Sequence, residues 1–150
     1  MNKIIITVVS VFTLSIVMTG CANEETKTIQ PTQSTETNTQ EISAVLTHEK
    51  IQNNEQVKII DVRAPEEYNE QHISNSTLVP LDSLSSEIAN VENLNKSDEI
   101  IVYCRSGRRS MEAYKILNSL GYTNVKTMVG GINEWKTLGY DVCLGSSLSC

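Results

Sequence analysis

A chain of 150 residues has room for one ordinary domain and is too short for two. Its formal net charge of −6 at pH 7 argues against a nucleic-acid binder that works through a broad basic face. The four cysteines form no Cys-x-x-Cys pair and the two histidines lack finger-like spacing, so we expect no structural zinc site.

The chain begins with a short positive segment and an apolar run from Ile4 to Met18. This run is shorter than the ~20 residues that cross a bilayer as a helix, but it matches the apolar core of a secretory signal peptide. Thr19, Gly20 and Cys21 follow in an order similar to the lipobox of bacterial lipoproteins, although Met18 departs from the aliphatic residue usual there. The similarity implies a signal peptide over residues 1–20.

In lipoproteins of this kind the cysteine receives a diacylglycerol, and the resemblance implies the same modification of Cys21. We therefore expect an extracytoplasmic protein that is anchored to the cell membrane through its N-terminal lipid. The alternative is a plain N-terminal membrane anchor in which Cys21 is incidental.

Residues 21–41 form a polar segment, and residues 24–40 within it are nearly all Thr, Gln, Glu, Ser and Asn. Such a composition cannot bury enough apolar surface to offset the conformational entropy lost on ordering. We expect this segment to be a disordered tether, and we expect the folded domain to cover residues 42–150.

The first half of the folded part is expected to alternate between helices and strands. The apolar patterns and the turn residues indicate a helix over 45–53, a strand over 58–62, a short helix from Pro65, a strand over 77–80 and an amphipathic helix over 81–89. Asp82 or Ser83 would cap the last of these helices.

The second half contains the clearest strand, at 99–104, where four successive apolar or aromatic residues imply burial on both faces, as in a parallel sheet. The remaining expected elements are a helix over 110–120 that ends at Gly121, a strand over 125–128, a turn at Gly130 and Gly131, and a helix over 132–138 that ends at Gly139. This alternation predicts an α/β fold with a mainly parallel sheet.

A candidate reactive cysteine stands where the clearest strand ends. Cys104 is followed by a loop that leads directly into a helix, and the loop contains Arg105, Arg108 and Arg109. Ligands of open α/β sheets bind at the carboxyl ends of the strands, and amides converging at a helix N-terminus bind anions. Together with the arginines, these amides favour a thiolate over a thiol and an anionic substrate beside it.

The heptapeptide Cys-Arg-Ser-Gly-Arg-Arg-Ser at 104–110 resembles the active-site loop of single-domain rhodaneses. Other family motifs follow the same order along the chain: Asp61-Val62-Arg63 with Glu66-Glu67-Tyr68, then His72-Ile73, Val79-Pro80-Leu81, and Gly130-Gly131-Ile132 with Trp135. The resemblance covers about residues 42–142. It departs from the family at Gln71, where glycine is usual, and at Ser74-Asn75-Ser76, where Pro-Gly-Ala is usual.

The resemblance implies a rhodanese-like α/β domain, whose mainly parallel central sheet is flanked by helices, and a sulfurtransferase activity. Cys104 would take the outer sulfur of thiosulfate or of a persulfide donor and pass it to a thiol or to a cyanide-like acceptor. The amides of the binding loop would hold the negative charge of the persulfide. The residues of that loop are Arg105, Ser106, Gly107, Arg108, Arg109 and Ser110.

The charged residues around the loop are expected to have different roles. Arg105 and Arg108 would attract the anionic donor, whereas Arg109 would brace the loop or a neighbouring carboxylate. Asp61 and Arg63 are expected to support the loop as a structural ion pair. His72 and Trp135 are interpreted as packing residues, and no metal or organic cofactor is implied.

Two other functions share this fold. Phosphatases of the cell-cycle type have an arginine six residues after the cysteine, but this chain has Ser110 there and an arginine one position earlier. A non-catalytic binding or regulatory module is the main alternative, although such domains commonly lack the cysteine that is present here.

Cys143 and Cys150 lie beyond the resemblance. In an oxidising compartment two nearby cysteines are expected to form a disulfide. The alternative is that one of them resolves the Cys104 persulfide in a relay. A redox partner protein is also expected, because an exposed thiolate at Cys104 would oxidise outside the cell.

Overall fold

The computed structural model describes residues 40–147 and Cys150. The expected signal peptide, the lipid attachment to Cys21 and the tether over 21–39 lie outside these residues. Glu41, which the sequence places at the end of the tether, already belongs to the first strand. No helix in the described ranges is long and apolar enough to cross a membrane.

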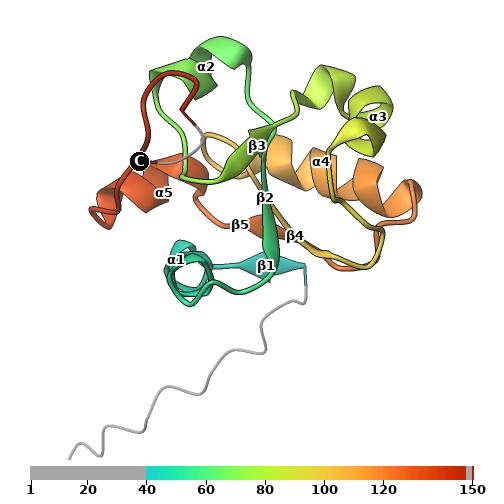
Figure 1. The fold of residues 1–150 in the computed structure, drawn as a ribbon, viewed down its shortest axis with the longest axis horizontal. Helices are drawn as coiled ribbons and strands as arrows, with labels where there is room; N and C mark the ends of the chain where they lie inside the picture. Colours follow the sequence, from blue (N-terminus) through green and yellow to red (C-terminus); the bar gives the residue numbers. More distant parts are fainter. Residues whose placement is uncertain (1–39, 148–149) are drawn as a thin grey trace, which may run out of the picture. The chain divides into compact units, whose positions relative to one another are not determined.

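A five-stranded sheet forms the centre of the fold, and each of its strand pairs is parallel (Figure 1). The strands lie in the order β1-β5-β4-β2-β3. Their bounds are Glu41–Ile42 for β1, Val57–Asp61 for β2, Ser76–Leu78 for β3, Glu99–Tyr103 for β4 and Val125–Met128 for β5. The expected α/β class with a parallel sheet is confirmed.

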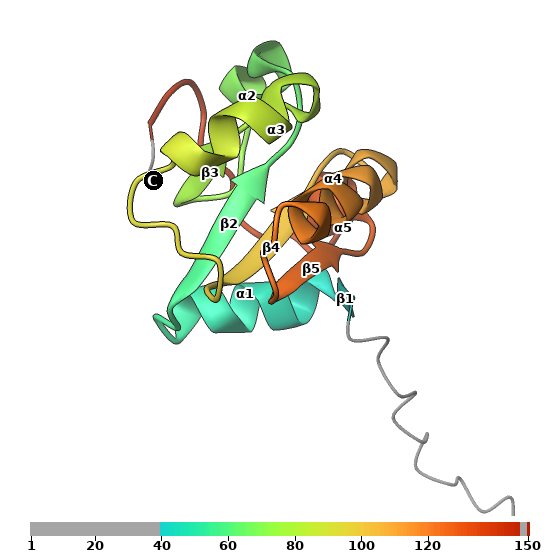
Figure 2. The same cartoon turned by 90° about the vertical axis from the view of Figure 1, so that its right-hand side faces the viewer.

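Helices cover both faces of the sheet because neighbouring residues of β2 and β4 point to opposite sides. Ile60 and Val102 face one core, which α3 and α4 cover, whereas Ile59 and Ile101 face the other, which α1 and α5 cover (Figures 1 and 2). The helices are α1 (Ala44–Gln52), α2 (Pro65–Glu70), α3 (Leu84–Glu87), α4 (Arg108–Ser119) and α5 (Gly131–Thr137).

The helix expected over 81–89 is instead three short turns. A 3₁₀ turn at Leu81–Ser83 precedes α3, and a second at Ile88–Asn90 follows it. The expected capping by Asp82 or Ser83 is wrong, because neither side chain makes a capping hydrogen bond. Ser83 has a right-handed helical backbone that continues the turn, and its hydroxyl donates to the carbonyl oxygen of Pro80.

Candidate active site

Cys104 directly follows β4, at the carboxyl end of the parallel sheet. Its neighbour Tyr103 pairs in register with Asp61, the last residue of β2, so the ends of two central strands lie beside the cysteine. Only 1% of Cys104 is exposed. The residue nevertheless lines a pocket of about 340 Å³, together with Arg105, Ser106, Arg108 and Arg109.

The loop after Cys104 is shorter than the sequence suggests. Helix α4 begins at Arg108, so Arg108, Arg109 and Ser110 form its first turn and do not belong to the loop. Gly107 at the N-cap has a φ of 105°, a left-handed conformation that favours glycine. This conformation turns the chain back, and the Gly107 amide donates a hydrogen bond to the Cys104 sulfur over 3.2 Å.

The pKa of the Cys104 thiol lies below its ordinary value. Burial alone would raise that pKa, but the backbone N–H groups of Ser110, Ser106 and Gly107 stabilise the thiolate and outweigh the cost of burial. The Ser110 hydroxyl lies 3.9 Å from the sulfur and acts in the same direction. The site therefore favours a nucleophilic sulfur and an anion bound at the same amides.

The N-terminus of α5 forms backbone hydrogen bonds with the loop that follows Cys104. The amide of Ile132 donates to the carbonyl oxygen of Cys104 over 2.9 Å, and the amide of Asn133 donates to that of Arg105 over 3.1 Å. A Cβ atom on Gly131 would overlap with the carbonyl oxygen of Cys104 and would lie 2.8 Å from that of Arg105. The turn expected at this position is thus also a contact surface for the active-site loop.

The arginines beside the pocket fall into two groups. Arg105 and Arg108 are exposed, so their guanidinium groups are available to an anion arriving from solvent. Arg109 forms a bidentate ion pair with Glu67 of α2, in which its two terminal guanidinium nitrogens lie 2.6 and 2.7 Å from the two carboxylate oxygens. Because of this pairing, and despite partial burial, the pKa of Glu67 is lowered to about 2. The expectation that Arg109 braces a neighbouring carboxylate is confirmed.

Comparison with known proteins places this geometry in a family. The model of the rhodanese-like domain matches residues 44–138. The chain belongs to the rhodanese-like family. A rhodanese-related protein from Thermoplasma volcanium has a solved structure with the same fold; it is 31% identical, with a TM-score of 0.62, over 70% of this chain and 98% of that one.

Several curated relatives of this rhodanese-like chain are named sulfurtransferases. Thiosulfate sulfurtransferase PspE of Escherichia coli is 39% identical over 75 residues, which is 50% of this chain and 70% of PspE. A thiosulfate:glutathione sulfurtransferase of Saccharomyces cerevisiae is 37% identical over 95 residues, covering 57% and 68% of the two chains. The putative sulfur carrier protein YrkF of Bacillus subtilis is 35% identical over 95 residues, and this match spans only 50% of that protein. The chain is accordingly classed with rhodanese-type sulfurtransferases.

Asp61 and Arg63 of this rhodanese-like domain form the expected ion pair. Both side chains are buried, and the Arg63 guanidinium donates to the Asp61 carboxylate over 2.6 to 3.0 Å. Arg63 also donates to the carbonyl oxygen of Gln71 over 2.7 Å. Neither residue lines the Cys104 pocket, and their pairing supports the end of β2.

The sequence gives no signal for the hydroxyl of Tyr103, which is fully buried beneath the site. It accepts a hydrogen bond from the Ile73 amide and pairs with the Ser76 hydroxyl, both over 3.1 Å. Burial raises the pKa of Tyr103 well above its ordinary value, so the hydroxyl is neutral. Tyr103 thus connects β4 to the segment that enters β3.

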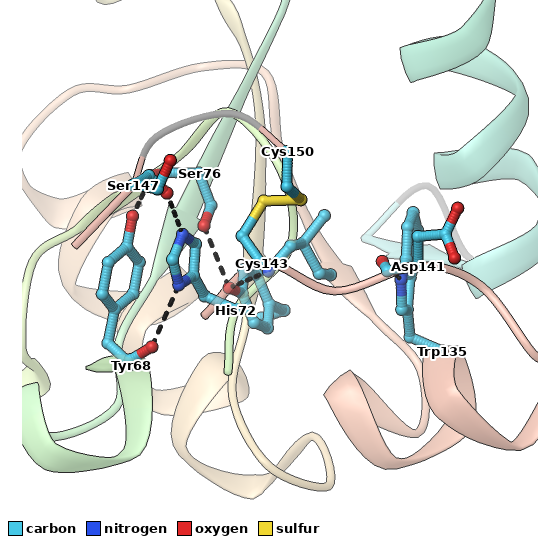
Figure 3. The surroundings of a disulfide bond; sticks show 10 residues. Tyr68, His72, Ser76, Trp135, Asp141, Cys143, Ser147 and Cys150 are labelled. Carbon is cyan, nitrogen blue, oxygen red and sulfur yellow. Dashed lines mark hydrogen bonds between the residues drawn. A yellow bond between two sulfur atoms is a disulfide. The ribbon is translucent and has the colours of Figure 1, made fainter. Parts of the chain in front are cut away.

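The two residues interpreted as packing residues are both buried. Trp135 donates from its indole nitrogen to the carbonyl oxygen of Asp141 over 2.9 Å. His72 stacks on the Tyr68 ring, with 3.8 Å between ring centroids, and is absent from the lining of the Cys104 pocket (Figure 3). Its ring nitrogens face the carbonyl oxygens of Tyr68 and Ser147, at 3.0 and 2.7 Å. His72 is therefore not placed to act as a general base for Cys104.

The C-terminal cysteines are joined. Cys143 and Cys150 form a disulfide with 5.4 Å between their Cα atoms (Figure 3). Cys104 is the free cysteine of the described ranges. In the same ranges, no group of three or more His, Cys, Asp or Glu side chains is arranged to hold a metal ion.

Proposed function

We propose that this domain transfers sulfane sulfur through a persulfide on Cys104. The observation that carries the proposal is the convergence of three backbone N–H groups on the buried sulfur of Cys104, a residue that lines a pocket with three arginines. The sulfurtransferase names of the relatives support the same reaction class.

The reaction has two displacement steps. In the first, the Cys104 thiolate attacks the outer sulfur of thiosulfate; a new S–S bond forms, the old one breaks, and sulfite leaves with the electron pair. A thiol or cyanide-like acceptor then attacks the outer sulfur of the persulfide, and the Cys104 thiolate leaves. Covalent catalysis divides one transfer into two easier steps, and the Ser106, Gly107 and Ser110 amides stabilise the anionic sulfur throughout.

The arginines provide selectivity for an anionic donor. Arg105 and Arg108 are exposed at the rim of the pocket and would pair with the oxygens of thiosulfate or with a persulfide anion. Arg109 contributes positive charge in a fixed orientation, since two hydrogen bonds to Glu67 hold its guanidinium.

Thiocyanate formation from thiosulfate and cyanide tests the proposal. We expect turnover by the full chain, none by Cys104→Ser, and a mass increase of one sulfur atom on Cys104 after thiosulfate alone. Ser119→Ala, an exposed change at the far end of α4, is the matched control. A folded protein with a titratable Cys104 but without turnover or sulfur uptake would contradict sulfur transfer and favour a binding or regulatory module.

We also propose that the domain works outside the cytoplasm, tethered to the cell membrane through a lipid on Cys21. The support is the order of residues 1–21 alone. Fatty-acid labelling of the full chain and fractionation of the cells test it: Cys21→Ser should abolish the label and release the protein from membranes. Retention of label in that variant would exclude the lipid anchor. An extracytoplasmic reductant or partner protein would keep Cys104 reduced.

A further inference from the structure

The segment that follows the family match is attached to helix α2. We call its described residues 143–147 and Cys150 the strap. It starts five residues after the rhodanese-like match ends, and the Cys143–Cys150 disulfide closes it. Figure 3 shows the disulfide beside His72 and Tyr68, which come from α2 and the residues that follow it.

Hydrogen bonds connect the strap to residues 69–72. Cys143 and His72 exchange backbone bonds of 2.8 and 3.0 Å, and the Gly145 amide donates to the carbonyl oxygen of Asn69 over 2.8 Å. The His72 ring bridges the two parts, since its nitrogens face the carbonyl oxygens of Tyr68 and Ser147 (Figure 3).

These contacts stabilise a helix that could not persist alone. Helix α2 has six residues, far fewer than an isolated helix requires in water. The last carbonyl groups of any helix lack partners within the helix. The Gly145 amide of the strap is the hydrogen-bond partner of the Asn69 carbonyl oxygen. The His72 ring, which contacts the strap, is the partner of the Tyr68 carbonyl oxygen.

Helix α2 also carries Glu67, which holds Arg109 at the Cys104 pocket. Glu67 stands two residues before Asn69, so the ion pair and the strap bond to Asn69 lie within one turn of the same short helix. A continuous series of contacts therefore leads from the disulfide to an arginine that lines the candidate active site.

We propose that the strap is a positioning element of the Cys104 site, and that opening its disulfide weakens the binding of the anionic donor. The proposal rests on the proposed function for the identity of that donor. With the strap released, the end of α2 loses its partners, Glu67 is no longer fixed, and Arg109 is no longer oriented toward the pocket. The amides around Cys104 belong to the loop and α4, so the nucleophile itself is unaffected.

A dithiol reductant would open the strap in two balanced steps. Cys143 is buried and Cys150 is exposed, so a thiolate of the reductant attacks the Cys150 sulfur. Cys143 leaves as a thiolate and takes up a proton. The second thiol of the reductant then displaces Cys150, which leaves two protein thiols and a disulfide of the reductant. The protein disulfide gains two electrons, and the dithiol loses two.

Steady-state kinetics of the full chain test the proposal. In Cys143→Ser/Cys150→Ser we expect the KM for thiosulfate to rise about two- to fivefold, the range for loss of a partly exposed ion pair. We expect kcat to stay within about twofold, as it should when an interaction shared by the ground state and the transition state is lost. An unchanged KM, or a fall in kcat alone, would overturn the proposal. If the variant does not fold, wild-type protein reduced by an immobilised dithiol is measured instead.

A double-mutant cycle shows whether the strap acts through Glu67. Glu67→Gln should raise the KM by a similar factor, and opening the strap in that background should add little. Multiplicative effects would refute the route through Glu67. Glu49→Gln, an exposed charge change on α1, is the matched control and should leave the effect of the strap intact.

Protection of Cys104 from iodoacetamide by sulfate measures anion binding without turnover. Opening the strap should raise the sulfate concentration that gives half-protection, while the alkylation rate without sulfate stays the same. If this shift occurs in a chain that transfers no sulfur, the strap proposal holds and the proposed function fails. If sulfur transfer occurs without this shift, the strap proposal fails.

Discussion

The carbonyl oxygen of Cys104 accepts a hydrogen bond from the Ile132 amide over 2.9 Å, which joins the active-site loop to the first turn of α5. The contact requires the backbone of α5 to lie against the loop, and Gly131 makes this approach possible because it has no Cβ atom. The position of the nucleophile thus depends on a glycine 27 residues away in the sequence.

Gly131→Ala is expected to destabilise the domain by about 2–5 kcal/mol, since it adds a collision with the loop to the strain of a φ of +56°. Gly139→Ala is the matched control. Its φ is +77°, but nothing lies within 4 Å of the added atom, so strain alone should cost about 1–2 kcal/mol. Urea unfolding measures both variants. Equal losses would show that the close approach does not matter.

Ser110→Ala is expected to raise the pKa of Cys104, because the serine hydroxyl helps to lower it. The midpoint of the pH profile for Cys104 alkylation should move upward, and the alkylation rate at neutral pH should fall. Ser119→Ala, in the last turn of the same helix, should leave the profile in place. An unchanged midpoint in Ser110→Ala would assign the lowered pKa to the backbone amides alone.

The Glu67–Arg109 pair predicts a loss of stability in acid. The pKa of Glu67 is lowered from 4.5 to about 2 in the folded chain, so the pair contributes fully above pH 4.5, and this contribution disappears as the pH falls toward 2. The side chains are 26% and 31% exposed, which limits the contribution to about 1 kcal/mol. Glu67→Gln should therefore be less stable than wild type at pH 7, and the difference should shrink between pH 4.5 and pH 2. A constant difference would contradict this assignment.

Tyr103→Phe should cost about 1–3 kcal/mol, because it leaves the buried Ile73 amide without its acceptor. Thermal or urea unfolding provides the measurement. Tyr114→Phe, a half-buried tyrosine of α4, serves as the comparison and should change stability less. Equal costs for the two changes would mean that another group replaces the Tyr103 hydroxyl.

Features that are local in the sequence were predicted well. The apolar run 100–103 indicated a buried parallel strand, and the left-handed Gly121 and Gly139 stand just beyond α4 and α5 as expected. The placement of Cys104 at a strand-to-helix junction is confirmed for the same reason: hydrophobic periodicity and glycine positions record local conformation.

Features that depend on distant partners were not foreseen. Strand β1 has two residues and exists through pairing with β5, so it has no periodicity of its own. Glu67 meets Arg109 across 42 positions, and the sequence predicts a bracing carboxylate without indicating which one. The attachment of the strap to α2 could not be predicted either. Most of its hydrogen bonds join backbone N–H and C=O groups, which nearly every residue has, so no sequence pattern marks them.

In the proposed reaction, the Cys143–Cys150 disulfide limits where sulfur can go after it reaches Cys104. While that bond is closed, the described ranges contain no second thiol to receive the sulfur. A relay between the cysteines of these ranges therefore requires the disulfide to open first. Under oxidising conditions the proposed transfer from Cys104 therefore has no acceptor thiol within the described ranges, and its rate should depend on the concentration of an added acceptor.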